Sequence, residues 1–284
     1  MAVARPRRVA RGVELFPART PTLPPATHTN SYAVGEREVL LVEPATPFDD
    51  ERRDWLTWAR AFEGQGRRVV GILLTHHHDD HIGGASFFAD ELGVPLLAHP
   101  ATAALLPKIR VDRSLADGDV ITLDGTSPMR LAVLHTPGHA PGHVCLFDEE
   151  AGTTIVGDMV ASEGTILIEP VDGDMIAYLA QLDRLAGLSA HVALPAHGEP
   201  IDDPTQLFRR YITHRLAREA KVVAAFASVP AEGAGLDVLL PVAYADTPRL
   251  LWPIARMSLE AHLVKLVREG RVARTNDGGY RLVA

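Results

Sequence analysis

A chain of 284 residues with a formal net charge of −8 can bury a sizeable core, as one large domain or as a domain with an appendage. Its hydrophobic fraction of 46% and charged fraction of 23% are those of an ordinary soluble globular protein. No run approaches the roughly 18 uninterrupted apolar residues of a membrane span, so we expect no membrane partner. The single cysteine, Cys145, excludes an intramolecular disulfide and fits a reducing compartment, so we expect a cytoplasmic protein.

The N-terminal segment "MAVARPRRVARGVELF" is rich in arginine but lacks the apolar core of a secretory signal. It is either a targeting segment or a leader into a first strand near Val9–Phe16, and we favour the leader.

The first two-thirds of the chain alternates predicted strands and helices. A Gly35-Glu36 turn between two apolar-rich runs predicts a hairpin over Asn30–Pro44. Acidic residues at the start and glycine at the end indicate a helix over Asp49–Gly66. Similar signals predict strands at Arg67–Leu74, Val94–Pro100, Val120–Leu123, Arg130–Leu134, His143–Phe147, Thr153–Val156 and His191–Pro195, and helices at Gly84–Gly93 and Met175–Leu188.

The composition changes near Ile201. From Thr205 onward, 12 Lys/Arg stand against 7 Asp/Glu, a net charge of about +5, which leaves about −13 for the preceding part. Helices are predicted over Gln206–Val229, over Leu236–Val242 and around Ala255–Val267, followed by two short strands around an Asn-Asp-Gly-Gly turn. Helices followed by a β-hairpin favour a winged-helix module, so we predict a catalytic domain over 1–203 and a helical linker with a winged-helix-like domain over 204–284.

The run "THHHDDHIGG" places four histidines and two aspartates directly after a buried strand. Imidazole and carboxylate groups held at the end of a rigid element are suitable ligands for a transition metal. Where the chain leaves the strand and enters a helix, His76 and His78 can point to one side and Asp80 and His81 to another. The run therefore predicts the beginning of two adjacent metal sites, with His77 and Asp79 facing elsewhere.

Three later positions offer the remaining ligands. His139 lies between Pro-Gly turns in "HTPGHAPGH", Asp158 directly follows an apolar strand in "TIVGDMVA", and His197 does the same in "LPAHGEP". Because each follows a predicted strand, all three could converge on one rim of a sandwich of sheets. Each signal is weak alone, but together and in this order they predict one metal centre.

The motifs "THHHDDH", "PGHAPGH", "GD" and "PAHG" resemble the metallo-β-lactamase superfamily of hydrolases over roughly residues 10–200. The resemblance implies an α/β fold, an αββα sandwich, and about two divalent ions per chain, zinc above all, with iron or manganese possible. It assigns the first metal to His76, His78 and His139, the second to Asp80, His81 and His197, and a bridging role to Asp158. Antibiotic-degrading members often carry cysteine where this chain has Asp158, which argues against that activity.

The tail "YITHRLARE" with the winged helix resembles the beta-lactamase-like protein 2 group. That group contains an endoribonuclease for single-stranded RNA, and related chains are thioesterases acting on polyketide acyl carriers. The resemblance thus implies either a hydrolase of a small-molecule or acyl-carrier substrate or a nuclease for single-stranded RNA. The acidic catalytic portion favours the first, and a mere binding protein is disfavoured by the complete ligand set.

A shared hydroxide between two metals would attack an ester, thioester or lactone, with Asp80 and Asp158 as the catalytic carboxylates. His143 and His135 flank the ligand loop and either support ligands or only bond the loop, and His28 either lines the pocket or is structural. The predicted recognition helix carries glutamates as well as arginines, so we expect no duplex DNA binding. We expect removal of the residues after Asp203 to leave metal binding largely intact and to lower turnover.

Overall fold

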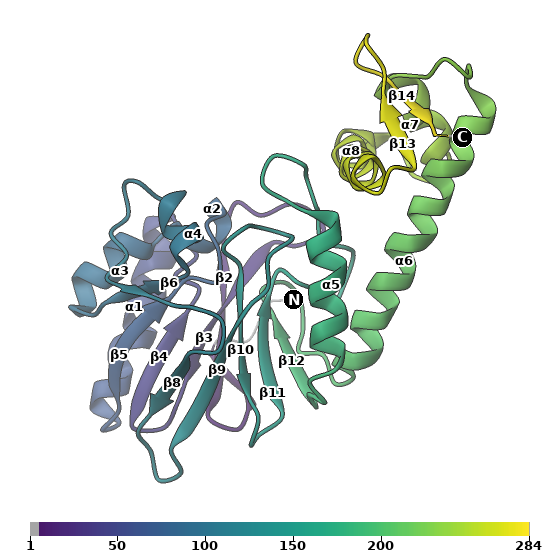
Figure 1. Ribbon diagram of the computed structural model, residues 1–284. Coiled ribbons are helices and arrows are strands. Elements are labelled where there is room, and N and C mark those ends of the chain that lie inside the picture. The colour runs from purple at the N-terminus through teal and green to yellow at the C-terminus, as the bar shows by residue number, and fades with distance from the viewer. Residues whose placement is uncertain (1–5, 284) are drawn as a thin grey trace. The chain divides into compact units, whose positions relative to one another are not determined.

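The computed structural model describes residues 6–283, which form two compact units (Figure 1). The first unit runs to Thr136 and also contains Pro141–Thr165 and Leu188–Thr205. The second unit contains the C-terminal segment from Gln206 together with two earlier segments, Pro137–Ala140 and Ile166–Gly187. Residues 1–5, where the arginine-rich N-terminal segment begins, lie outside the described residues.

A seven-stranded mixed sheet forms one layer of the first unit, in the order β1-β2-β3-β4-β5-β6-β7. Neighbours from β1 to β4 pair antiparallel and those from β4 to β7 pair parallel. Gly35 closes the expected β3–β4 hairpin with φ of +119°, where a side chain would collide with the backbone of Glu38. The strands are β1 Arg7–Ala10, β2 Val13–Arg19, β3 His28–Val34, β4 Glu38–Val42, β5 Arg68–Leu73, β6 Leu96–Ala98 and β7 Arg113–Ser114.

A five-stranded sheet forms the second layer, in the order β12-β11-β10-β9-β8. Its pairs are antiparallel except β11 with β12, which run parallel. The strands are β8 Val120–Leu123, β9 Met129–His135, β10 Val144–Asp148, β11 Thr153–Gly157 and β12 Val192–Pro195.

The core of the first unit lies on both faces of the seven-stranded sheet. Between the sheets, side chains such as Leu15 and Val42 pack against Val133 and Leu146 of the second sheet. On the outer face, apolar side chains of the sheet pack against helices α1 (Asp49–Gly64) and α3 (Ala85–Leu92). Apolar residues at helical spacing give α1 one aromatic face, and this face is buried against the sheet. Burying each large side chain stabilises the fold by about 1.5–3 kcal/mol.

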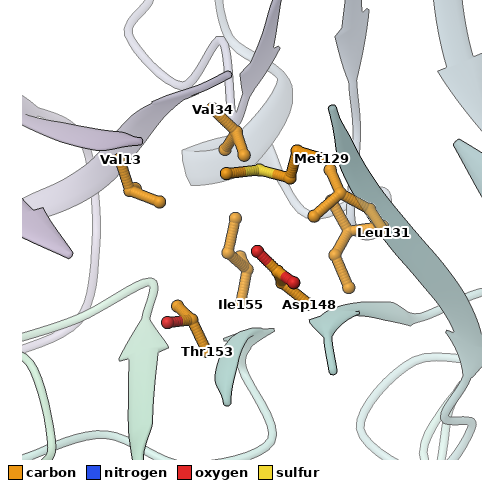
Figure 2. A pocket seen from close by; sticks show the side chains of 8 residues that line it. Val13, Val34, Met129, Leu131, Asp148, Thr153 and Ile155 are labelled. Atoms are coloured by element: carbon orange, nitrogen blue, oxygen red, sulfur yellow. The ribbon is translucent and has the colours of Figure 1, made fainter. Parts of the chain in front are cut away.

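A small cavity between the two sheets is lined by side chains of β2, β3, β9, β10 and β11 (Figure 2). Its lining residues come from the beginnings of β9 and β11, whereas the predicted ligands follow the ends of strands. The cavity therefore lies away from the predicted metal centre.

The second unit contains the expected helices and terminal hairpin. Leu239 of α7 packs with Leu259, Leu263 and Leu266 of α8 and with Tyr280 of the hairpin in a separate apolar core. Its elements are α5 Met175–Ala186, α6 Pro204–Ala225, a 3-10 turn Phe226–Ser228, α7 Leu236–Ala243, a 3-10 turn Arg249–Leu251, α8 Trp252–Arg268, β13 Val272–Arg274 and β14 Tyr280–Leu282. No helix among the described residues has the length and apolar character needed to cross a membrane.

Candidate metal centre

The histidine run leaves the end of β5 and forms a single short helix, α2 (Asp79–Ile82). Gly83 follows this helix and lies close to the backbone of Ala45. A Cβ atom on residue 83 would lie 2.7 Å from the carbonyl oxygen of Ala45. This close approach fixes the path of the run. His76 and His81 are fully buried, whereas Asp79 is exposed, as expected for a residue that does not belong to the centre.

Asp80, His81 and His197 present their ligand atoms within 4.8 Å of one another. Asp158 lies beside them: His81 Nε2 is 3.5 Å from its Oδ2, and His197 Nε2 is 3.4 Å from its Oδ1. The corresponding distances from the two imidazoles to Asp80 are 3.6 and 3.5 Å. A tetrahedral site with bonds of ~2.0–2.2 Å has ligand–ligand separations of roughly 3.3–3.6 Å, so these four groups have the spacing of a metal cage.

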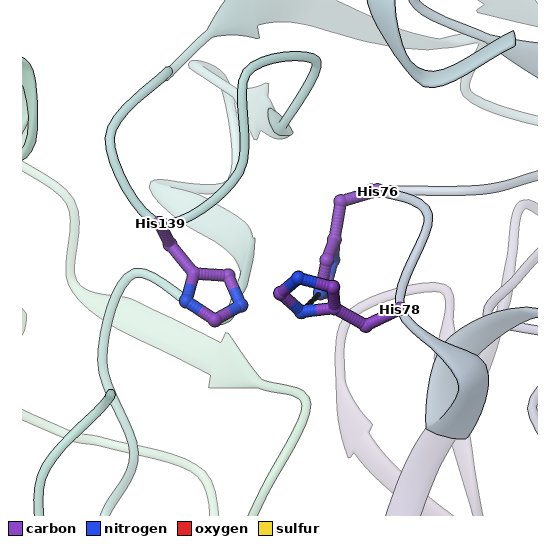
Figure 3. A group of neighbouring side chains, drawn as sticks. All are labelled: His76, His78 and His139. Atoms are coloured by element: carbon purple, nitrogen blue, oxygen red, sulfur yellow. Dashed lines mark hydrogen bonds between the residues drawn. The ribbon is translucent and has the colours of Figure 1, made fainter. Parts of the chain in front are cut away.

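His76, His78 and His139 form the second candidate group, again with ligand atoms within 4.8 Å of one another (Figure 3). His76 Nε2 and His78 Nδ1 are 3.0 Å apart. His139 comes from the β9–β10 loop, as its Pro-Gly flanks predicted. The structure thus brings the members of each proposed set together. It also groups His76 with His81 and Glu43, across the two sets, and groups His77 with His78 and Asp172, although His77 was expected to face elsewhere.

Glu43, which the sequence reasoning missed, orients a histidine of each set. It is buried, accepts a hydrogen bond from the Thr75 hydroxyl, and has Oε2 3.2 Å from His81 Nδ1. Because Thr75 gives its proton to Glu43, its oxygen accepts from His76 Nδ1 at 2.9 Å. Both imidazoles then carry the lone pair on Nε2, the nitrogen that faces the other ligands.

The position of Glu43 is itself strained. Its φ of +60° lies in the left-handed region that bulky residues avoid, at a cost of about 1–2 kcal/mol. Its carbonyl accepts from the Ser31 hydroxyl and its amide donates to Leu73 at 3.0 Å, which hold the conformation. The signal was available in the sequence, because a carboxylate directly after an apolar strand is what also marked Asp158.

His197 and its loop are held by hydrogen bonds to residues near the N-terminal end of the sequence. Its Nδ1 donates to the carbonyl of His28 at 3.0 Å, which places the lone pair on Nε2. The Asn30 amide donates to the carbonyls of Pro195 and Gly198 at 2.9 and 2.8 Å and so brackets the loop that carries His197. The contribution of His28 to this contact comes from its backbone.

His143 supports Asp158. The Asp158 amide donates to His143 Nε2 at 3.0 Å, so this ring is neutral with its proton on Nδ1, which donates to Thr136 Oγ1 at 2.8 Å. Gly157 allows this contact, because a Cβ there would lie 2.5 Å from the His143 ring. His135 instead donates Nε2–H to the Pro141 carbonyl at 2.9 Å and ties down the β9–β10 loop. Among the described residues, no candidate metal group contains His99, His191, His214 or His262.

The electrostatics of the centre favour ionised carboxylates. Burial opposes the charge of Asp158, but His197 and His81 outweigh it and hold the pKa of that carboxyl well below its usual range. Burial likewise opposes protonation of His81, yet Asp80, Glu43 and Asp158 raise its pKa well above the usual value. The pKa of Asp80 is lowered despite burial, chiefly by His81. A cation replacing the histidine proton would neutralise the same carboxylates, so metal binding should release protons.

The donor set fits a metal cofactor. The Nε2 atom of His81 is buried and makes no hydrogen bond, because the carboxylate oxygens that it faces, on Asp158 and Asp80, lie 3.5 and 3.6 Å away. An unsatisfied buried imidazole is costly, and a metal ion between these groups would remove the cost. Imidazole and carboxylate ligands suit zinc, iron and manganese alike, so the donors indicate a transition metal.

Comparison with known proteins gives matches to both units. Residues 24–197 match the metallo-beta-lactamase superfamily, and residues 236–281 match the beta-lactamase associated winged helix domain. A Beta-lactamase-like protein 2 homolog from Drosophila melanogaster is 33% identical over 262 residues, 88% of this chain and 86% of that protein. An Atrochrysone carboxyl ACP thioesterase from Aspergillus chevalieri is 29% identical over 266 residues, 89% of this chain and 80% of the relative. A crystal structure of a metallo-beta-lactamase family protein from Thermus thermophilus is similar with a TM-score of 0.76 and 26% identity, covering 96% of this chain and 99% of that one.

Proposed function

Because the chain belongs to the metallo-beta-lactamase superfamily, an established family of metal-dependent hydrolases, we propose that it hydrolyses an ester, thioester or lactone at a dinuclear metal centre. The observation that carries the proposal is the presence of two ligand groups, each with its ligand atoms within 4.8 Å of one another: His76, His78 and His139, and Asp80, His81 and His197. Asp158 lies beside the second group, 3.5 Å from His81 Nε2 and 3.4 Å from His197 Nε2, and we propose that its carboxylate also serves the first group. A site with one ion would not need the second group of histidines.

The proposed ligands divide into two sets. Zinc is the proposed metal, at about two ions per chain, and iron or manganese would suit the same donors. When bound, two such ions supply a hydroxide near neutral pH and polarise the oxygen of the scissile bond. The first set is His76, His78 and His139, the second is Asp80, His81 and His197, and Asp158 is shared.

The side chains of the proposed site have different roles in the reaction. Asp80, half-buried and with a lowered pKa, stays ionised, so its carboxylate can accept a hydrogen bond from the attacking water and orient it. Glu43 keeps His76 and His81 in the tautomer with the lone pair on Nε2. The buried faces of the histidines limit the access of bulk water, which strengthens the electrostatic interactions within the centre.

We propose an acyl thioester, carried on a small thiol or an acyl carrier, as the preferred substrate class. The relative from Aspergillus chevalieri is named as a thioesterase and matches most of this chain, including the part that follows the metallo-beta-lactamase region. The net negative charge of the part before Thr205 is unfavourable for a polyanion such as RNA.

The test is one panel of substrates with metal-loaded protein: acyl thioesters of increasing chain length, lactones and single-stranded RNA, with metal content measured on the same sample. We expect about two ions per chain and thioester hydrolysis that a chelator abolishes and added metal restores. Activity that is unaffected by chelation, or cleavage of RNA with no turnover of any acyl substrate, would overturn the proposal.

A further inference from the structure

The loop that carries His139 is fastened to the segment Ile166–Gly187, which belongs to the same compact unit. His139 Nδ1 donates to the carbonyl of Leu167 at 2.9 Å, so its lone pair is on Nε2. The amide of Asp174 donates to the carbonyl of Gly138 at 2.8 Å. Gly138 has φ of +136°, and a Cβ there would lie 2.3 Å from the backbone nitrogen of Tyr178 in α5. The position of His139 is therefore set by α5 and the residues before it.

The C-terminal helices hold that segment in turn. Arg215 of α6 is buried, donates to the carbonyl of Ile166 next to Leu167, and places its guanidinium over the Tyr178 ring, 5.7 Å from the centroid. Arg268 of α8 pairs with Asp174 Oδ2 at 2.5 Å. The other oxygen of Asp174 caps α5 by accepting from the amides of Ile176 and Ala177.

We propose that Arg215 and Arg268 are positioning residues for the proposed metal ligand His139 and act through the segment Ile166–Gly187 of the same compact unit. The proposal rests on the dinuclear centre proposed above. The other ligand set, Asp80, His81 and His197 with Asp158, lies entirely in the first unit and uses none of these contacts. Loss of the C-terminal anchors should therefore affect the two metal sites unequally.

The contacts of the two arginines differ in strength. Arg215 is buried, and removing it leaves a carbonyl beside Leu167 without its charged donor, so this change should disturb His139 strongly. The pair between Arg268 and Asp174 is partly exposed, at 53% and 35%, so its loss should be milder. The sequence-based expectation that removal of the residues after Asp203 leaves metal binding largely intact stays a prediction, and the present proposal instead expects one of the two sites to weaken.

The experiment compares Arg215→Met with Arg218→Met on the full-length protein. Arg218 lies on the same helix, but its guanidinium bonds Ala243 and Asp246, within the winged-helix part, and so provides a matched control. Two quantities are measured: metal ions per chain after equilibration with limiting zinc, and hydrogen exchange of residues 136–143 and of the Asp174 amide in the metal-free protein. Asp174→Asn, which keeps the oxygen that caps α5, is the second and milder variant.

We expect Arg215→Met to weaken one zinc site about 10- to 100-fold, so that metal content falls from about two ions toward one, with faster exchange in the His139 loop. Asp174→Asn should weaken the same site by up to about fivefold, and Arg218→Met should match the wild type. Wild-type exchange and metal content in Arg215→Met and Asp174→Asn would overturn the proposal. If the wild type itself bound fewer than two ions, the dinuclear centre would be wrong, and exchange in metal-free protein would still decide whether Arg215 positions the loop.

Discussion

Replacing Glu43 with glutamine tests whether this buried carboxylate sets the geometry of the metal centre. The glutamine has nearly the same shape but only one accepting oxygen, whereas Glu43 accepts from Thr75 and faces His81 Nδ1 at 3.2 Å. Its amide NH2 must therefore face one of those two donors. Losing one hydrogen bond to a charged group costs about 1.5–3 kcal/mol, which corresponds to a loss of roughly 10- to 100-fold in metal affinity.

The assay is competition with a chromophoric chelator, which reports the dissociation constant of each bound ion. Glu38→Gln is the matched control, because Glu38 begins β4, the strand that ends just before Glu43, and its carboxylate pairs with Arg68 at the surface. We expect Glu43→Gln to lose at least tenfold in affinity and Glu38→Gln to remain unchanged. An affinity for Glu43→Gln within twofold of the wild type would show that Glu43 does not orient the histidines.

Three further predictions concern other parts of the molecule. Asp158→Ala should abolish most turnover and bound metal, whereas exposed Asp79→Ala should change neither by more than about twofold; equal losses in metal analysis and kinetics would contradict the ligand assignment. Asn30→Ala removes two hydrogen bonds that bracket the loop with His197 and should lower the free energy of unfolding by about 1–3 kcal/mol in a urea titration; an unchanged midpoint would refute this. Burial raises the pKa of Glu219, but the nearby His262 and the ion pairs with Lys265 and Arg271 outweigh it and lower the pKa to about 2 from 4.5. Glu219→Gln should therefore cost up to ~3 kcal/mol of stability at neutral pH, and chemical unfolding at several pH values should show that this difference shrinks as the pH falls below about 4.5.

The family and the fold class expected from the sequence are confirmed by the comparisons, and many elements lie where local patterns placed them. The strand Val120–Leu123 has the expected bounds, and the β3–β4 hairpin turns at Gly35. These predictions succeeded because apolar periodicity and turn residues are local signals. Helix α4 (Pro100–Ala104) and strand β7 were not predicted, because elements of five and two residues are too short to show a period.

The candidate ligands could also be chosen from the sequence, because each follows an apolar strand, and a polar side chain at such a position indicates a functional role. The groups that orient them could not all be found this way. Asn30 and the carbonyl of His28 reach the loop of His197 across more than 160 residues of chain, and Leu167 reaches His139 through its backbone. Every residue has a backbone carbonyl, so the residue type does not show which carbonyl will bind a ligand. Contacts between distant segments of the sequence depend on the tertiary structure. The roles of the ligands themselves remain predictions until metal is measured.

The unequal spacing of the proposed ligands along the chain has a consequence for folding in the presence of metal. His76, His78, Asp80 and His81 lie within one short run, whereas His139, Asp158 and His197 arrive from distant loops. We therefore expect the unfolded chain to keep a local chelating segment that binds metal weakly before the sheets have formed. Since a ligand stabilises the folded state only by its preference over the unfolded one, excess zinc should raise the melting temperature by less than its native affinity implies. Refolding with zinc present would then begin from a chain that already holds an ion at the segment that follows β5.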